Sequence, residues 1–298
     1  MRLISFQREG STRIGLVELE AGRVVDLQAV EPRLPRDMAD FIAGGEASRN
    51  AALEAAEQAP AEARLALEEV GVLAPLPQPA RNVICVGKNY AAHAGEFSGT
   101  AGSASGVSGD LPEHPIFFTK APTAVIGAGE PIPAHLDPTG SVDYEGELAV
   151  VIGRGGRGIP AAEAFDHVFG YTIVNDVTSR TLQKRHTQWF LGKSLDGFCP
   201  MGPLLVTADE IADLEAVEVT THVNGERRQA GRLADLIFDI PTLIETLSAG
   251  MTLQPGDVIA TGTPEGVGAG FDPPRYLRSG DRVEVHVSGI GTLRNAVE

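Results

Sequence analysis

Hydrophobic and polar residues alternate over short distances at the start of the chain. Between residues 1 and 27, apolar runs of a few residues are separated by Glu-Gly and Ala-Gly pairs, a pattern that predicts a β-meander. Helical spacing follows at 37–43 and 50–58. The second helix is expected to end at Ala59-Pro60, because proline has no backbone N–H to donate. Together these elements predict a small α+β unit.

A proline-rich segment separates this unit from the rest of the chain. Residues 71–82 contain three prolines, which is typical of a linker, so we expect a small N-terminal domain at 1–75 and a larger domain at 76–298. The larger domain is rich in β signals and has helical spacing at 234–249. The whole chain is therefore predicted to be a β-rich α+β protein. Buried strands are expected at 83–86, 116–118, 147–152 and 171–174, and half-exposed strands at 217–223 and 283–287.

The charge of the chain disfavours some classes of partner. With 24 basic against 40 acidic residues, the formal net charge is −16. Nucleic acid is therefore not expected as a partner, because an acidic surface repels phosphate backbones. An anionic substrate would need a metal ion or local Lys and Arg to reverse the sign inside a pocket. No apolar run approaches the length of about 18 residues that spans a membrane.

The N-terminal residues and the cysteines bear on the compartment. The start MRLISFQREG has no long apolar segment of the kind found in secretory signals. Cys85 and Cys199 are both expected to be buried small hydrophobes rather than nucleophiles. A chain with only two cysteines is typical of a reducing compartment. A cytoplasmic location is therefore expected.

Three carboxylates form the main chemical signal in the sequence. Glu145 and Glu147 lie two residues apart in SVDYEGELAVVIG, so on a strand both side chains point to one face. Asp176 ends another apolar run, YTIVND. Like charges beside buried strands repel one another unless a cation neutralises them, and oxygen ligands suit Mg²⁺ or Mn²⁺. The alternative is a solvated strand edge that carries its glutamates by chance.

A glycine pattern in the same region offers a competing interpretation. Gly153, Gly155 and Gly158 form GxGxxG after a predicted strand, and Asp176 follows, which is the order of the dinucleotide-binding fingerprint. The connection from Gly158 to Tyr171 contains Pro160 and is barely long enough for a crossover helix. A plain glycine-rich turn is therefore favoured over binding of a dinucleotide.

Residues 97–111 differ in composition from the rest of the chain. They include four glycines and four serines, a composition that does not form a packed core. The segment is interpreted either as a disordered surface insertion or as a mobile lid, and its position directly after His93 and Glu96 favours the lid.

Five segments of the larger domain, between residues 83 and 268, are VICVGKNYAAHAGE, VDYEGELAVVIG, GYTIVNDVTSR, KSLDGFCPMGP and GDVIATGTPEGVG. They resemble motifs of the fumarylacetoacetate hydrolase family, in the order of that family. The resemblance implies a mixed β-roll catalytic domain preceded by a small N-terminal α+β domain, usually in a homodimer. Within the family, the chain resembles most the branch of acylpyruvases and 2-hydroxyhepta-2,4-diene-1,7-dioate isomerases.

The resemblance also implies roles for individual residues. One divalent ion per subunit, Mg²⁺ or Mn²⁺, would be bound by Glu145, Glu147 and Asp176. His93 and Glu96 match a water-activating dyad on a short helix, where a spacing of three residues places them on one side. Further matches are Lys193 as the active-site lysine, and Arg180, Gln183, Lys120 and Thr263 as substrate contacts. The family often has Arg-Asp where this chain has Arg180-Thr181, which puts fine substrate assignment in doubt.

The activity implied is metal-dependent hydrolysis of a C–C bond in a small 2-oxo acid of the acylpyruvate or fumarylpyruvate type. Oxaloacetate decarboxylation and isomerisation or hydration of 2-hydroxydienoates from aromatic-acid breakdown begin with the same chelated 2-oxo acid, so both stay open. An NAD-binding oxidoreductase is a remote alternative. A catalytically inactive metal-binding module is disfavoured, because the dyad and the lysine are both present.

Overall fold

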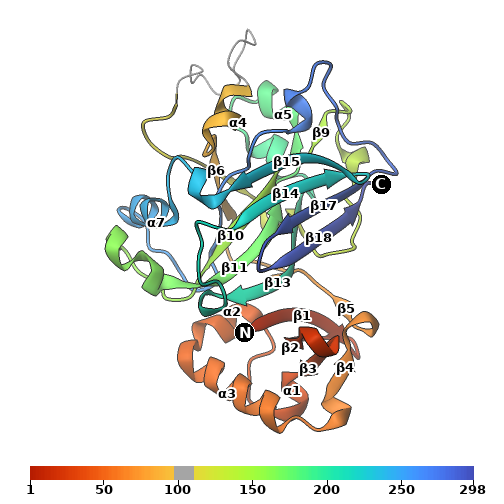
Figure 1. Ribbon diagram of the computed structural model, residues 1–298, viewed down its shortest axis with the longest axis vertical. Coiled ribbons are helices and arrows are strands. Elements are labelled where there is room, and N and C mark those ends of the chain that lie inside the picture. The colour runs from red at the N-terminus through yellow and green to blue at the C-terminus, as the bar shows by residue number, and fades with distance from the viewer. Residues whose placement is uncertain (97–110) are drawn as a thin grey trace.

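The predicted meander forms the core of the N-terminal part. The computed structural model describes residues 1–96 and 111–298, and its first strands pair in antiparallel order with helices packed beneath them (Figure 1). The third helix begins five residues earlier than predicted and ends, as expected, before Ala59-Pro60. The elements are β1 (Arg2–Arg8), β2 (Ser11–Glu18), β3 (Arg23–Asp26), α1 (Leu27–Val30), α2 (Met38–Ala43), α3 (Gly45–Gln58), β4 (Arg64–Ala66) and β5 (Gly71–Val72).

One sheet runs from this part into the rest of the molecule. β1 pairs antiparallel with β13, so the strand order is β4-β3-β2-β1-β13-β11-β10-β16-β6-β7. Because the sheet crosses the expected linker, the boundary near residue 75 stays a prediction. The additional strands are β6 (Val83–Gly87), β7 (Ile116–Lys120), β10 (Gly146–Ile152), β11 (Val168–Asn175), β13 (Cys199–Thr207) and β16 (Val258–Ala260).

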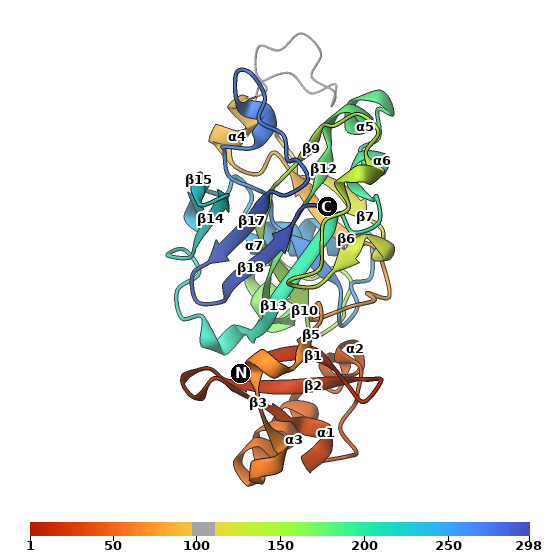
Figure 2. The same ribbon diagram turned by 90° about the vertical axis from the view of Figure 1, so that its right-hand side faces the viewer.

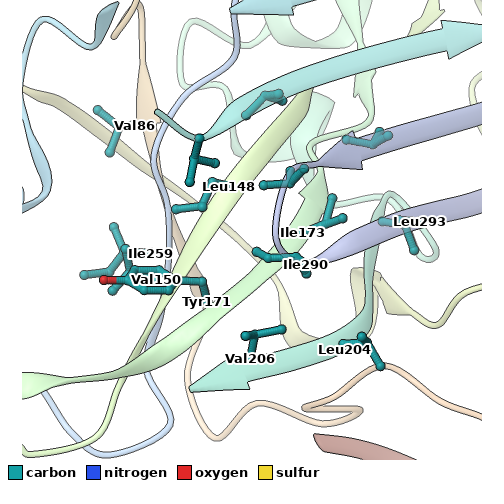
Figure 3. Close-up of a cluster of buried hydrophobic side chains, with 14 of the residues drawn as sticks. Val86, Leu148, Val150, Tyr171, Ile173, Leu204, Val206, Ile259, Ile290 and Leu293 are labelled. Carbon is teal, nitrogen blue, oxygen red and sulfur yellow. The ribbon is translucent and has the colours of Figure 1, made fainter. Parts of the chain in front are cut away.

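A smaller sheet of order β15-β14-β17-β18 packs against the large one. Apolar side chains of both sheets form one buried cluster, in which Leu148, Ile173 and Leu293 are each no more than 1% exposed (Figure 3). The two sheets and the flanking helices form the expected β-rich α+β fold. The strands are β14 (Glu218–Val223), β15 (Glu226–Arg232), β17 (Arg282–Val287) and β18 (Gly291–Ala296).

The helix expected at 234–249 is shorter than predicted. Helix α7 spans Ile240–Ser248 and is capped by Asp239, whose carboxylate accepts a hydrogen bond from Thr242 N. This cap and the proline at position 241 set the start of the helix. Helical spacing alone did not register the cap.

Short elements around the edges of the sheets carry the candidate site. Figure 2 shows α4, α5, α6, β9 and β12 gathered at the end of the molecule opposite the N-terminal part. Short 3-10 turns fill other connections, the longest at Ala161–His167. The bounds are α4 (Ala91–Glu96), β8 (Val125–Ile126), β9 (Val142–Asp143), β12 (Thr178–Ser179), α5 (Arg180–Arg185) and α6 (Phe190–Lys193).

The structure settles several smaller expectations. β10 and β11 are antiparallel, so Gly153, Gly155 and Gly158 do not open a parallel βαβ unit and the dinucleotide-binding interpretation is wrong. Cys85 and Cys199 are buried free thiols. Within the described ranges, no helix is long and apolar enough to cross a membrane. The expected lid at 97–111 lies outside the described residues except for Leu111.

Candidate active site

The antiparallel pairing of β10 and β11 brings the three predicted carboxylates together. Gly146 lies opposite Asn175 in the register, so Glu145, Glu147 and Asp176 meet at one end of the strand pair. One ligand oxygen from each lies within 4.8 Å of the others. All three side chains are buried, with exposures of 5%, 1% and 0%. This group is called the carboxylate triad below.

Three cations lie against the triad. Lys193 Nζ is 2.8 Å from Glu145 Oε2 and 2.7 Å from Asp176 Oδ2. Lys120 Nζ is 2.5 Å from Asp176 Oδ1 and also donates to Val177 O. Burial lowers the pKa of Lys193, but the charges of Asp176 and Glu145 outweigh burial and raise it above its ordinary value. Lys193 therefore stays protonated inside the site.

Arg180 and Gln183 lie on the α5 side of the triad. Arg180 Nη2 is 2.7 Å from Glu145 Oε1, and its Nε donates to Asp143 Oδ2 at 2.8 Å. Gln183 Oε1 accepts from Arg180 Nη1 at 3.3 Å. Arg180, one of the four residues predicted as substrate contacts, is thus paired with a predicted metal ligand, and Gln183, another of the four, contacts Arg180.

The electrostatics of the triad fit a divalent cation. Burial raises the pKa of Glu147 well above its ordinary value, and the charges of Asp176 and Glu145 raise it further. The hydrogen bond to Glu147 comes from the backbone N–H of Gly262, at 2.8 Å. A buried cluster of hard oxygen donors with this mutual repulsion suits Mg²⁺ or Mn²⁺. Such an ion would remove the repulsion that raises the pKa of Glu147.

The His93–Glu96 dyad is formed as predicted on α4. His93 Nδ1 is 2.7 Å from Glu96 Oε2, and Glu96 Oε1 accepts from Gly266 N at 2.7 Å. His93 lies close enough to the triad to help lower the pKa of Glu145, where Lys193 and Arg180 together outweigh the effect of burial. Since Nδ1 is engaged by Glu96, Nε2 is the atom that would exchange protons with a substrate.

The hydroxyl of Thr263 is hydrogen-bonded to protein groups beside the site. Its Oγ1 donates to Gly146 O at 3.0 Å and accepts from Gln229 Nε2 at 2.7 Å. Gln229 Oε1 in turn accepts from Gly146 N at 3.1 Å. These bonds fix the backbone between the two glutamates of the triad. A substrate contact by Thr263 stays a prediction.

Asp143 and Gln229 support the site, although neither was identified from the sequence. Asp143 is fully buried and accepts from Arg180 Nε, from Gly268 N at 2.6 Å and from Ala269 N at 2.9 Å. It therefore orients the arginine and anchors the segment that follows Thr263. Asp143 lies within the motif VDYEGELAVVIG. Membership of this motif was the one feature of the sequence that could have indicated its role. Nothing in the polar run around Gln229 distinguishes it from a surface residue.

We expect the substitution Asp143→Asn to lower the free energy of unfolding by about 3 kcal/mol, because it breaks a buried ion pair and leaves Arg180 with less compensation. Chemical denaturation in the presence of Mg²⁺ measures the change. The control is Asp209→Asn, which removes an exposed partner of Arg49 and should change stability by less than about 1 kcal/mol. Equal effects of the two substitutions would contradict the supporting role of Asp143.

Comparison with known proteins decides the family. The model of the fumarylacetoacetate hydrolase C-terminal domain matches residues 82–298. The chain belongs to the fumarylacetoacetate hydrolase family. It is 49% identical over 296 residues to oxaloacetate tautomerase YisK of Bacillus subtilis, which covers 95% of each chain. The family predicted from the five motifs is therefore confirmed.

Solved structures confirm the fold along the whole chain. A fumarylacetoacetate hydrolase from Exiguobacterium antarcticum is 45% identical, with a TM-score of 0.84 over 100% of this chain and 99% of that one. Maleylpyruvate hydrolase from Sphingobium sp. SYK-6, solved with manganese(II) and pyruvate, is 32% identical, with a TM-score of 0.79 over 100% and 98%. This chain is thus an enzyme of a family whose members include tautomerases and hydrolases.

Proposed function

We propose that this enzyme interconverts the keto and enol forms of oxaloacetate, with a divalent ion bound by the carboxylate triad. The observation that carries the proposal is the His93–Glu96 dyad, fixed at 2.7 Å beside the buried triad. This arrangement places a proton carrier next to a metal-binding site. The similarity to oxaloacetate tautomerase YisK over 95% of the chain supports oxaloacetate as the substrate.

A divalent ion held by Glu145, Glu147 and Asp176 would act as a Lewis acid and make the C3 protons of a bound 2-oxo acid more acidic. His93 removes one of these protons through Nε2, and Glu96 stabilises the imidazolium that results. The C3–H bond breaks, a C2–C3 double bond forms as the C2–O π bond is lost, and the imidazolium of His93 delivers a proton to the 2-oxygen. No carbon–carbon bond breaks in this sequence.

Charged residues around the triad suit a dianionic substrate. Glu145, Glu147, Asp176 and Asp143 face Lys120, Lys193 and Arg180, so four acids meet three cations. With all four acids ionised, these residues carry one net negative charge, and a bound divalent ion would make the total positive. Lys193 stays protonated beside the carboxylate oxygens of Glu145 and Asp176. Its positive charge stabilises negative charge that develops on the 2-oxygen of the substrate. Arg180 and Gln183 are proposed to contact the 4-carboxylate.

Hydrolysis of an acylpyruvate is the second candidate. The same dyad can deprotonate a water molecule, and the similar maleylpyruvate hydrolase was solved with manganese(II) and pyruvate. The C–C hydrolysis expected from the sequence therefore stays a prediction. Tautomerisation is preferred because it needs only the proton transfer that the dyad geometry already supports.

A stopped-flow assay tests the proposal. Crystalline enol oxaloacetate is dissolved and its ultraviolet absorbance is followed as the keto form appears. The Mg²⁺-loaded enzyme should accelerate this decay in proportion to enzyme concentration, and EDTA should remove the acceleration. A decay that matches the enzyme-free rate, together with cleavage of acetylpyruvate to acetate and pyruvate, would favour hydrolysis instead.

A further inference from the structure

A polar cavity lies apart from the residues of the triad and the dyad. It has a volume of about 250 Å³ and is lined by the β14–β15 turn and by the segment 274–281. None of its lining residues belongs to the carboxylate triad or to the His93–Glu96 dyad. Its polar lining residues are Asn224, Arg228, Arg275, Tyr276, Arg278 and Asp281.

Positive charge gathers around this cavity. Arg228 and Arg275 both stack on Phe271, at 5.4 and 5.1 Å from the ring centre. Arg278 is exposed and brings a third guanidinium to the lining. In a chain with a net charge of −16, three arginines at one cavity concentrate positive potential where an anion can reach it.

The acidic groups near the cavity are already engaged. Glu226 accepts from both Nη atoms of Arg275, at 2.8 and 2.7 Å, and lies 3.0 Å from Arg228. Asp281 accepts from Asn224 Nδ2 and from Arg278 N, both at 2.8 Å. Two acids therefore face three arginines, which leaves one uncompensated positive charge.

Arg228 supplies unused donors in a buried position. Its side chain is 8% exposed; the Tyr144 hydroxyl lies near its guanidinium, but its Nε and Nη1 atoms have no hydrogen-bond partner of good geometry among the described residues. Buried guanidinium donors without acceptors cost free energy, and an oxyanion is the ligand that satisfies them best.

The cavity is connected to the dyad through the backbone. Arg275 N donates to Gly268 O at 2.8 Å, and Gly268 N donates to Asp143. Two residues earlier, Gly266 N donates to Glu96. A ligand on Arg275 would therefore steady the segment that holds both Glu96 and Asp143.

We propose that this cavity, the arginine pocket, binds a small oxyanion carrying phosphate or carboxylate groups, independently of the metal centre. Binding of the anion makes local unfolding of segment 262–276 less frequent. The enzyme thus has one anion site at the carboxylate triad, where the reaction takes place, and a second site that stabilises backbone segment 262–276 next to the dyad.

Titration calorimetry with inorganic phosphate on the Mg²⁺-loaded full chain tests the pocket. Arg278→Gln should weaken binding about tenfold, the effect of losing one charge-assisted hydrogen bond. The matched control Arg157→Gln removes the same charge from an exposed arginine elsewhere and should leave affinity unchanged. Glu147→Gln, which disables the metal site, should also leave it unchanged. A second titration with succinate separates a preference for phosphate from one for carboxylate.

Hydrogen exchange provides the second readout. Phosphate should slow amide exchange in peptides that cover 262–276 in the parent chain and not in Arg278→Gln. The proposal is overturned if the parent chain binds neither anion. It is also overturned if Glu147→Gln alone abolishes binding, if Arg157→Gln weakens binding as much as Arg278→Gln, or if exchange does not change.

Discussion

Replacing Glu147 by glutamine is expected to weaken binding of Mg²⁺ and Mn²⁺ by more than about 100-fold, because even groups that only orient metal ligands contribute 10- to 100-fold. The amide keeps the size of the side chain and an oxygen that can accept from Gly262 N. It removes a carboxylate whose pKa is raised by burial and by Asp176 and Glu145. Titration calorimetry measures the affinity, and tautomerase activity should be lost with it.

A second readout separates lost binding from misfolding. Without metal, Glu147→Gln should unfold at a higher temperature than the parent chain, because it relieves repulsion inside the triad. Glu163→Gln, an exposed glutamate on the 3-10 turn at Ala161–His167, is the control and should change neither property. Unchanged metal affinity in Glu147→Gln would remove Glu147 from the metal site.

The substitution His93→Ala is expected to lower the rate of tautomerisation by about 10² to 10⁴, the usual contribution of a general base. Metal affinity should persist, because His93 is not one of the three carboxylate ligands. Steady-state assays and calorimetry on the same preparation measure both quantities. His286→Ala, an exposed histidine on β17, is the matched control. A rate in His93→Ala within twofold of the parent enzyme would exclude the dyad as the proton carrier.

Glu96→Gln distinguishes a functional dyad from a histidine acting alone. It keeps a group that can accept from Gly266 N but cannot stabilise an imidazolium by charge. The rate should therefore fall, by less than in His93→Ala, and its pH dependence should shift because the charge beside the imidazole is gone.

Local spacing explains what could be predicted from the sequence. Glu145 and Glu147 are two residues apart on an extended segment, and His93 and Glu96 are three apart on a helix. In both cases chain geometry alone places the side chains together. The strand near 147–152 was identified from a continuous apolar run, which is buried on both faces, and the strand near 217–223 from Val and Thr at every second position.

Long-range contacts explain what could not be predicted. Gln229 binds Gly146 across 83 residues and Thr263 across 34, and Lys120 reaches Asp176 across 56. Strand β15, with the sequence ERRQAGR, has no apolar alternation because it lies at the edge of the smaller sheet. Strand β15 pairs with its neighbour β14 and contacts segment 262–278. The contact with segment 262–278 places β15 beside the site and the arginine pocket, and the sequence alone does not predict it.

Tautomerisation moves a proton between C3 and the 2-oxygen and leaves the carbon skeleton intact. Proton NMR of oxaloacetate in D₂O with the Mg²⁺-loaded enzyme tests this most directly. The C3 protons should exchange for deuterium faster than without enzyme while oxaloacetate stays intact. His93→Ala should lose this acceleration. Accumulation of pyruvate with release of carbon dioxide, and no enhanced exchange before it, would show that the enzyme decarboxylates oxaloacetate instead.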